Sequence, residues 1–190
     1  MGTSANRNLV LATIAFAVSF AVWGLISGLA PIFRAEYGLT AFQTSLMVAI
    51  PVLLGSLGRI PMGLLTDRYG GRIVFSALLV FGFVPAVALA LDHSYGALLF
   101  WGFLIGLAGS SFAVGVGFVS PWYPPGKQGL ALGIYGAGNI GQSIAVFGAP
   151  VLATTIGVAA TFPVFGAASL IWGIVFYLFA RNAQRASPPR

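Results

Sequence analysis

The stretch GSLGRIPMGLLTDRYGGR, residues 55–72, joins an arginine inside an apolar run to a short charged loop. Arg59 is the one charged residue in the segment 37–66. It precedes Asp67 by eight residues, which in a helix corresponds to ~12 Å of depth from the loop. Because a charge within a bilayer costs at least a few kcal/mol, an intramembrane arginine indicates a functional site.

The composition around this stretch is that of a membrane protein. Charged residues make up 6% and hydrophobic residues 58% of the chain, whereas about a quarter of the residues in soluble domains are charged. Several runs also reach the ~20 apolar residues needed to cross a bilayer. We therefore predict an all-α membrane protein, one bundle over residues 1–190, with six transmembrane helices at about 9–33, 40–66, 73–92, 94–120, 128–155 and 159–180.

The basic residues predict the orientation of this bundle, because short cytoplasmic loops are enriched in lysine and arginine. Arg34 falls on one side of the six-span arrangement. The other side holds Arg7, Arg68, Arg72, Lys127, Arg181, Arg185 and Arg190. We expect both termini to be cytoplasmic and the chain to lie in the cell membrane, the inner one where there are two. The net charge of +6 then reflects topology and contact with lipid headgroups rather than nucleic-acid binding.

The residues that commonly carry catalysis or bind metals are scarce. Cysteine is absent, and the single histidine, His93, stands beside Asp92 at a predicted span end. The sequence contains neither a carboxylate pair nor a serine–base arrangement typical of nucleophilic catalysis. We therefore expect no enzymatic activity, no metal and no cofactor.

A glycine-rich run in the fifth predicted span has two interpretations. Residues 136–141, GAGNIG, match the G-x-G-x-x-G pattern of dinucleotide-binding folds, but that pattern needs a preceding strand and a following acidic residue, and no acidic residue follows Asp92. Gly133, Ala137 and Gly141 instead recur every four residues, a spacing that favours close helix packing. Asn139 within this run needs a partner, either a neighbouring helix or a bound anion. At a depth similar to that of Arg59, it is expected to meet Arg59 at one central site.

The loop that follows Arg59 resembles a known family signature. Residues 63–72, GLLTDRYGGR, are similar to the loop between the second and third helices of the major facilitator superfamily, with Gly63, Asp67, Arg68, Gly70 and Arg72 at its fixed positions. The resemblance implies a conformational role for this loop. Residues 51–61, which include Arg59, and residues 129–141 resemble the nitrate/nitrite porter family within that superfamily.

This resemblance assigns expected roles to individual residues. Arg59 would bind the anion directly, Asn139 would hydrogen-bond it, and Phe20 and Phe112 would form aromatic walls of the cavity. Tyr135, one turn before Asn139 and expected on the same face, is a further candidate. The chemistry agrees, because a planar oxyanion suits the two-pronged guanidinium group of arginine.

Members of the family have two six-helix halves, and the resemblance here covers one. We expect a second copy of the chain to complete the transporter as a parallel homodimer; the alternatives are that a separate second-half chain completes it or that the sequence is a fragment of a longer protein. The predicted function is transport of nitrate or nitrite by alternating access, with anion exchange or uniport favoured over symport driven by a carboxylate. Two alternatives stay open. A proton-coupled exporter of drugs or organic anions would be expected to carry a carboxylate within a span. A non-transporting membrane scaffold would give Arg59 no role.

Overall fold

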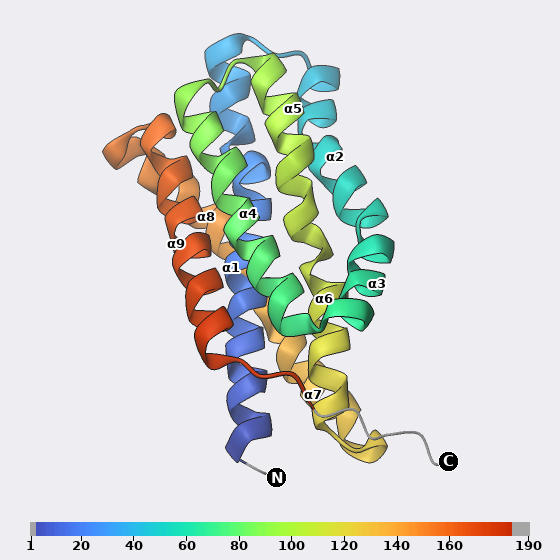
Figure 1. Ribbon diagram of the computed structural model, residues 1–190. Coiled ribbons are helices and arrows are strands. Elements are labelled where there is room, and N and C mark those ends of the chain that lie inside the picture. Colours follow the sequence, from blue (N-terminus) through green and yellow to red (C-terminus); the bar gives the residue numbers. More distant parts are fainter. Residues whose placement is uncertain (1–2, 184–190) are drawn as a thin grey trace.

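The computed structural model describes residues 3–183 and is helical throughout its membrane-crossing part (Figure 1). Six helical segments are long and apolar enough to cross a membrane: Thr3–Tyr37, Ala41–Tyr69, Gly71–Leu91, Tyr95–Trp122, Pro125–Ile156 and Val158–Phe179. The predicted fold class, six transmembrane helices, is thereby confirmed. With an even number of crossings, the start of the first helix and the end of the last lie at the same end of the bundle.

Three of the six spans are continuous helices, and three are interrupted. The continuous ones are α1 (Thr3–Tyr37), α4 (Gly71–Leu91) and α9 (Val158–Phe179). The second span divides into α2 (Ala41–Leu57) and α3 (Arg59–Tyr69) at Gly58. The other two contain 3-10 turns and comprise α5 (Tyr95–Ile105), η1 (Gly106–Ser110), α6 (Ser111–Val119) and η2 (Ser120–Trp122), then α7 (Pro125–Gly136), η3 (Ala137–Asn139) and α8 (Ile140–Ile156).

Local sequence explains where several helices begin and end. Thr40 caps α2 through a reciprocal pair of hydrogen bonds with Gln43, an arrangement that satisfies two otherwise unpaired backbone donors. Gly70 and Gly157 separate consecutive helices and have positive φ angles of 85° and 90°. Glycine is suited to both positions because it has no Cβ to clash in that conformation.

The core of the bundle is built around α1, which lies centrally in Figure 1. The apolar stretch of α1 is 61% buried, whereas those of α2–α3, α7–α8 and α9 are 22%, 28% and 28% buried. Glycines bring α1 and α8 together: a methyl group at Gly28 would lie 2.7 Å from the Ala145 carbonyl oxygen. The interrupted spans α2–α3 and α7–α8 therefore keep broad apolar faces that this chain does not cover.

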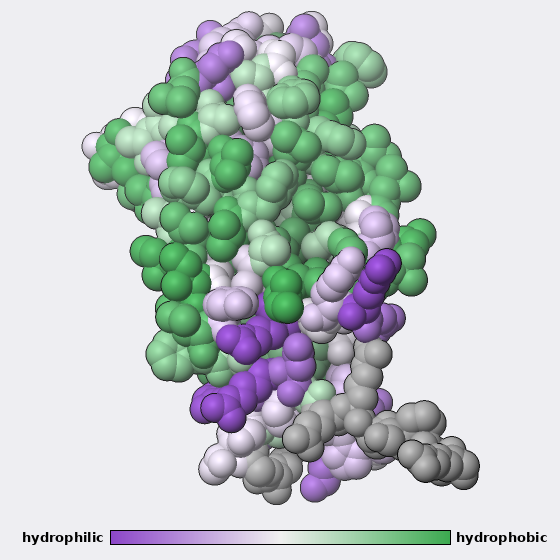
Figure 2. Space-filling model, in the orientation of Figure 1, coloured by the Kyte–Doolittle hydropathy of each residue, from purple (hydrophilic) through white to green (hydrophobic). Residues whose placement is uncertain are grey.

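The surface shows a hydrophobic belt with hydrophilic residues gathered at its two ends (Figure 2). The helix order places the start of α1, the α3–α4 loop, the connection into α7 and the end of α9 at one end. That end carries Arg7, Arg68, Arg72, Lys127 and Arg181, while Arg34 lies at the other. Arg185 and Arg190 lie outside the described residues. The cytoplasmic orientation of the basic end stays a prediction.

Candidate functional site

Arg59 lies at the break that divides the second span. It is the first residue of α3 and is exposed in this chain. The preceding Gly58 packs closely against η1, since a methyl group there would lie 3.1 Å from Leu107 Cδ1 and 3.6 Å from Ser110 Cβ. The break is therefore supported by its neighbour, and Arg59 is presented at a defined point about 12 Å from the α3–α4 loop.

Asn139 lies at the corresponding irregularity of the fifth span. It ends the 3-10 turn η3 and is exposed. The adjacent Gly138 packs against α1, where a methyl group would lie 2.8 Å from the Thr13 carbonyl oxygen. Gly141 also contacts α1, at the backbone of Ala17. The other members of the predicted packing triad, Gly133 and Ala137, are exposed in this chain.

Aromatic side chains of α1, α6 and α7 pack together in one cluster. Phe16 of α1 is fully buried and its ring centroid lies 4.3 Å from Phe20, 5.7 Å from Phe112 and 4.8 Å from Tyr135. Phe112 belongs to α6 and is 39% exposed, so its ring lies at the edge of the cluster. Phe20, Phe112 and Tyr135, which the sequence analysis selected, thus belong to one aromatic cluster.

Two further aromatic residues belong to this neighbourhood and were not predicted as site residues: Phe16 and Trp23. Trp23 lies 5.0 Å from Phe20 between ring centroids, and its indole N–H donates a hydrogen bond of 3.4 Å to the Pro51 carbonyl oxygen. A methyl group at Gly109 would lie 3.0 Å from the indole nitrogen. The spacing of Phe16, Phe20 and Trp23, four and three residues apart, is a helical stripe that could have indicated both residues.

The expectation that Tyr135 and Asn139 share a helix face is wrong in this structure. Tyr135 is fully buried and its hydroxyl donates a hydrogen bond of 2.8 Å to the Ser111 carbonyl oxygen, whereas Asn139 is exposed. The 3-10 turn Ala137–Asn139 lies between them. Because a 3-10 turn contains three residues rather than 3.6, it rotates the following residues relative to a regular α-helix.

The distribution of charged residues along the depth of the bundle favours an anion as a ligand. The carboxylates of residues 3–183, Glu36, Asp67 and Asp92, all lie at or near helix ends. Outside the membrane, hydrogen bonds from Ser94 lower the pKa of the Asp92 carboxyl group below its ordinary value. Within residues 3–183 no group of three His, Cys, Asp or Glu residues could hold a metal ion. The Arg59 guanidinium group and the Asn139 amide are hydrogen-bond donors suited to an oxyanion.

The loop motif lies at the basic end of the bundle, where α3 meets α4. Asp67, Arg68 and Gly70 line a cavity of about 700 Å³ that the residues Asn182 and Ala183 help to enclose. The Arg68 guanidinium lies 5.3 Å from the Tyr69 ring centroid. Gly63 has open space where a side chain would project.

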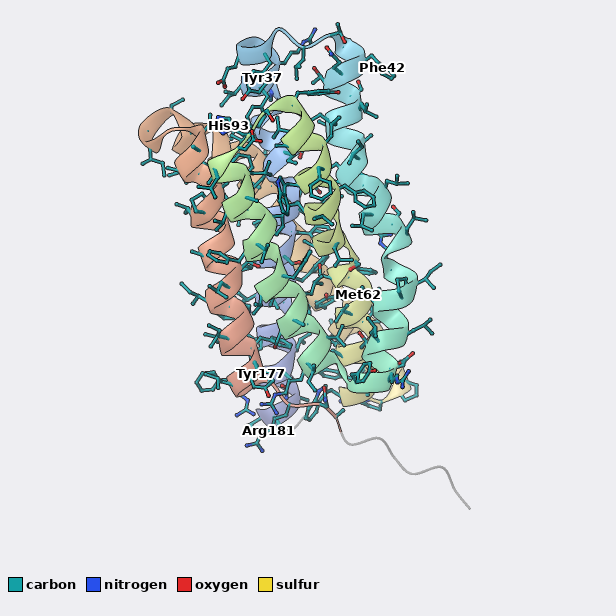
Figure 3. The ribbon with its side chains drawn as sticks, turned by 45° about the horizontal axis from the view of Figure 1, so that its top comes forward. Tyr37, Phe42, Met62, His93, Tyr177 and Arg181 are labelled. Carbon is teal, nitrogen blue, oxygen red and sulfur yellow. The ribbon has the colours of Figure 1, made fainter. Side chains whose placement is uncertain are left out.

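Residues after α9 fasten this loop to the rest of the bundle. The Asn182 side-chain oxygen accepts a hydrogen bond of 2.9 Å from the Arg72 backbone N–H, and Arg72 Nε donates one of 2.7 Å to the Tyr177 carbonyl oxygen. Asn8 of α1 accepts a hydrogen bond of 2.8 Å from the Arg181 N–H. Figure 3 shows Tyr177 and Arg181 at the end of the bundle opposite Tyr37 and His93. The loop motif, the start of α1 and the end of α9 therefore form one connected structure.

Comparison with known proteins gives matches along most of the chain. The model of the Major Facilitator Superfamily matches residues 11–190. A probable nitrate/nitrite antiporter NarK1 of Thermus thermophilus is 44% identical over 79% of this chain and 34% of its own length. A probable nitrate/nitrite transporter NarK2 of Mycobacterium tuberculosis is 36% identical over 95% of this chain and 47% of its own. The chain thus spans about a third to a half of the length of these relatives.

Solved structures agree on the fold. A bacterial homolog of the human lysosomal transporter Spinster, in an inward-facing conformation, matches with a TM-score of 0.81 at 19% identity, over 100% of this chain and 46% of its own. The xylose transporter XylE from E. coli matches with a TM-score of 0.71 at 17% identity, over 94% of this chain and 48% of its own. In each case the described bundle corresponds to one half of the larger fold.

Proposed function

This chain belongs to the major facilitator superfamily, as its loop motif predicted, and we propose that it forms one half of a nitrate/nitrite transporter. Its curated relatives are named as nitrate/nitrite transporters or as a nitrite extrusion protein. The observation that carries the proposal is Arg59: an exposed arginine at a helix break deep within an apolar span. Such a charge is costly within a membrane and is explained by an anionic substrate.

Arg59 and Asn139 are the proposed anion ligands. Nitrate and nitrite present oxygens that can accept hydrogen bonds from both prongs of a guanidinium group, and an asparagine amide can supply a further donor. Phe20 and Phe112 would limit access of water, which strengthens the interaction between the anion and Arg59. Tyr135, being buried, would contribute by fixing the positions of Phe16 and Phe112 rather than by contacting the anion.

The uncovered faces of α2–α3 and α7–α8 support the need for a second membrane half. Val52, Leu57, Ile60, Ile140 and Phe147 on these helices are 45–76% exposed, and Arg59 and Asn139 lie on the same two spans. We propose that a second copy of the chain covers these faces in a parallel, two-fold arrangement. Two copies would supply Arg59 and Asn139 twice around one central cavity that opens alternately to either side of the membrane.

In the proposed dimer the chains lie in the cell membrane and both termini of each face the cytoplasm. This orientation places the basic end of the bundle on the cytoplasmic side, as short basic loops favour. A cavity with two arginines would be strongly positive when empty. A change from one orientation of the transporter to the other without a bound anion would therefore be unfavourable. This favours exchange of anions over proton-coupled export, for which the described spans offer no central carboxylate.

Reconstitution of the purified chain tests the proposal. Liposomes loaded with nitrite should take up labelled nitrate, and the protein should have the mass of a dimer in the same preparation. Liposomes containing the Arg59→Lys variant should not take up labelled nitrate, although that variant keeps the positive charge. A dimeric wild-type chain without uptake would overturn the transport proposal, whereas a monomer that becomes active only with a separate chain would overturn the homodimer.

A further inference from the structure

We propose that the groove between α3 and α4 binds an acyl chain of an anionic phospholipid whose phosphate is held at Arg68. The inference rests on the membrane-spanning fold and is independent of the proposed substrate. It concerns a surface that neither Arg59 nor Asn139 lines, near the end of the bundle where α3 and α4 meet.

The groove is apolar and reaches from the loop into the membrane-spanning part. Its volume is about 410 Å³, and its walls include Met62 and Leu65 of α3, Ile73, Ala77 and Phe81 of α4, and Leu107 of η1 at the inner end. Figure 3 labels Met62 on α3. Ile73 is 51% exposed and Leu65 is 39% exposed, so the groove opens outward. From Ile73 to Phe81, α4 rises ~12 Å, most of the ~15 Å depth of one leaflet's hydrocarbon.

The mouth of the groove is polar, and its charged lining residues are the acidic Asp67 and the basic Arg68. Tyr69 lines both the groove and the 700 Å³ loop cavity, so the apolar and polar spaces adjoin. Arg68 lines that cavity, with its guanidinium over the Tyr69 ring. A ligand that fills both spaces needs an apolar tail and an anionic head, because arginine binds phosphate oxygens through charge-assisted hydrogen bonds.

The surrounding charges favour an anionic lipid over a zwitterionic one. Asp67 in the same cavity is acidic and would repel a phosphate, and Arg72 Nε already donates a hydrogen bond to the Tyr177 carbonyl oxygen. The lipid phosphate is therefore expected to approach Arg68. The same end of the bundle also carries Arg7, Lys127 and Arg181. Basic residues next to the membrane attract anionic lipids.

The inner end of the groove adjoins the break next to Arg59. Leu107 Cδ1 lies 3.1 Å from the position that a methyl group at Gly58 would take. An acyl chain against Leu107 would therefore pack one side chain away from the α2–α3 junction. Bound lipid is expected to stabilise the folded bundle, because a ligand that binds the folded state raises the melting temperature.

Lipid titration of the full chain in an uncharged detergent tests the proposal. Phosphatidylglycerol should raise the melting temperature and appear as a bound adduct in native mass spectrometry, with phosphatidylcholine weaker. Arg68→Gln should reduce the phosphatidylglycerol affinity about fivefold and remove the preference. Ala77→Phe, which fills the groove from an exposed position, should remove binding of both lipids. Ala168→Phe, at an exposed position of α9, is the matched control and should bind as wild type.

Three outcomes would overturn the proposal. Ala77→Phe that binds phosphatidylglycerol as wild type does would exclude the groove, provided that its melting temperature without lipid equals that of Ala168→Phe. Equal binding of the two lipids by the wild type would exclude selection by Arg68. Stabilisation by glycerol phosphate as large as that by the lipid would show that the acyl chain plays no part.

Discussion

The Tyr135 hydroxyl donates a hydrogen bond of 2.8 Å to the carbonyl oxygen of Ser111, the first residue of α6. This contact joins the helix before the Asn139 turn to the helix that carries Phe112. Gly115, one turn further along α6, makes room for it, because a side chain there would collide with the Tyr135 hydroxyl. The helix before the Asn139 turn and the helix that carries Phe112 are thus held together by a buried tyrosine.

Replacement of Gly115 by alanine is expected to destabilise the bundle. The added methyl group must displace the Tyr135 ring, and overpacking of this kind typically costs about 1–3 kcal/mol. The melting temperature of the purified chain should fall. Gly129→Ala is the matched control, because Gly129 is an exposed residue of α7 with open space at its Cβ position; it should be neutral or slightly stabilising. Equal melting temperatures would contradict the role of Gly115.

Arg59→Lys is expected to abolish uptake of nitrate while leaving the melting temperature nearly unchanged. Lysine keeps the charge but lacks the planar fork that binds two oxygens at once. The side chain is exposed in the single chain, so the fold itself should tolerate the change. Uptake at the wild-type rate by the lysine variant would contradict direct binding of the anion by the guanidinium group.

Asn139→Ala separates the two interpretations of this asparagine. If its amide donates to the anion, substrate affinity should fall about 13- to 160-fold, equivalent to the ~1.5–3 kcal/mol of one hydrogen bond to a charged group. The measurement is a substrate titration of uptake, with the oligomeric mass determined alongside. Normal affinity with a changed mass would instead assign Asn139 to helix packing between chains.

The six spans and the position of Arg59 within one of them could be predicted, because charged residues and the lengths of apolar runs are visible in the sequence. Six apolar runs separated by charged loops leave few other arrangements in a bilayer, and a lone arginine in such a run is visible without coordinates. The breaks at Gly58, η1 and η3 were not predicted. Each contains glycine, but a glycine in a membrane span also serves close packing, so its presence alone does not distinguish packing from a break.

The burial of Tyr135 and the contact of Asn182 escaped prediction for related reasons. The face of Tyr135 depends on the three residues of η3, whose tighter turn changes the helical phase. The Asn182 side chain and the Arg72 backbone are 110 residues apart in the chain. The first relationship depends on a local turn that regular helical spacing does not show, and the second on how whole helices pack.

Asn182→Ala is expected to destabilise the loop end of the bundle. Gly70, which precedes α4, has no side chain to cap the helix, and Asn182 supplies the missing acceptor from elsewhere in the chain. Loss of an N-terminal cap costs about 0.5–2 kcal/mol, which thermal unfolding of the purified chain would detect. Asn182→Asp retains the acceptor and places a negative charge near a helix start, so its stability should equal or exceed that of wild type. An alanine variant as stable as the aspartate variant would contradict the capping role.

Mixed dimers test whether two copies of the chain share one anion site. Wild-type and Arg59→Ala chains, mixed one to one and allowed to pair at random, should leave about a quarter of the dimers fully wild type. If each site needs both arginines, uptake per milligram of total protein should fall to about that fraction.

The matched control mixes wild type with Arg34→Ala, a change at an exposed position of α1 far from the breaks, and should keep full uptake. Measured masses must show that the Arg59→Ala chain still pairs. Uptake near half of wild type would mean that each chain transports by itself, and the shared site would be wrong. A value near a quarter excludes independent sites, because these cannot lose more activity than the fraction of mutant chains, and it is the value expected when Arg59 of both copies acts on the same anion.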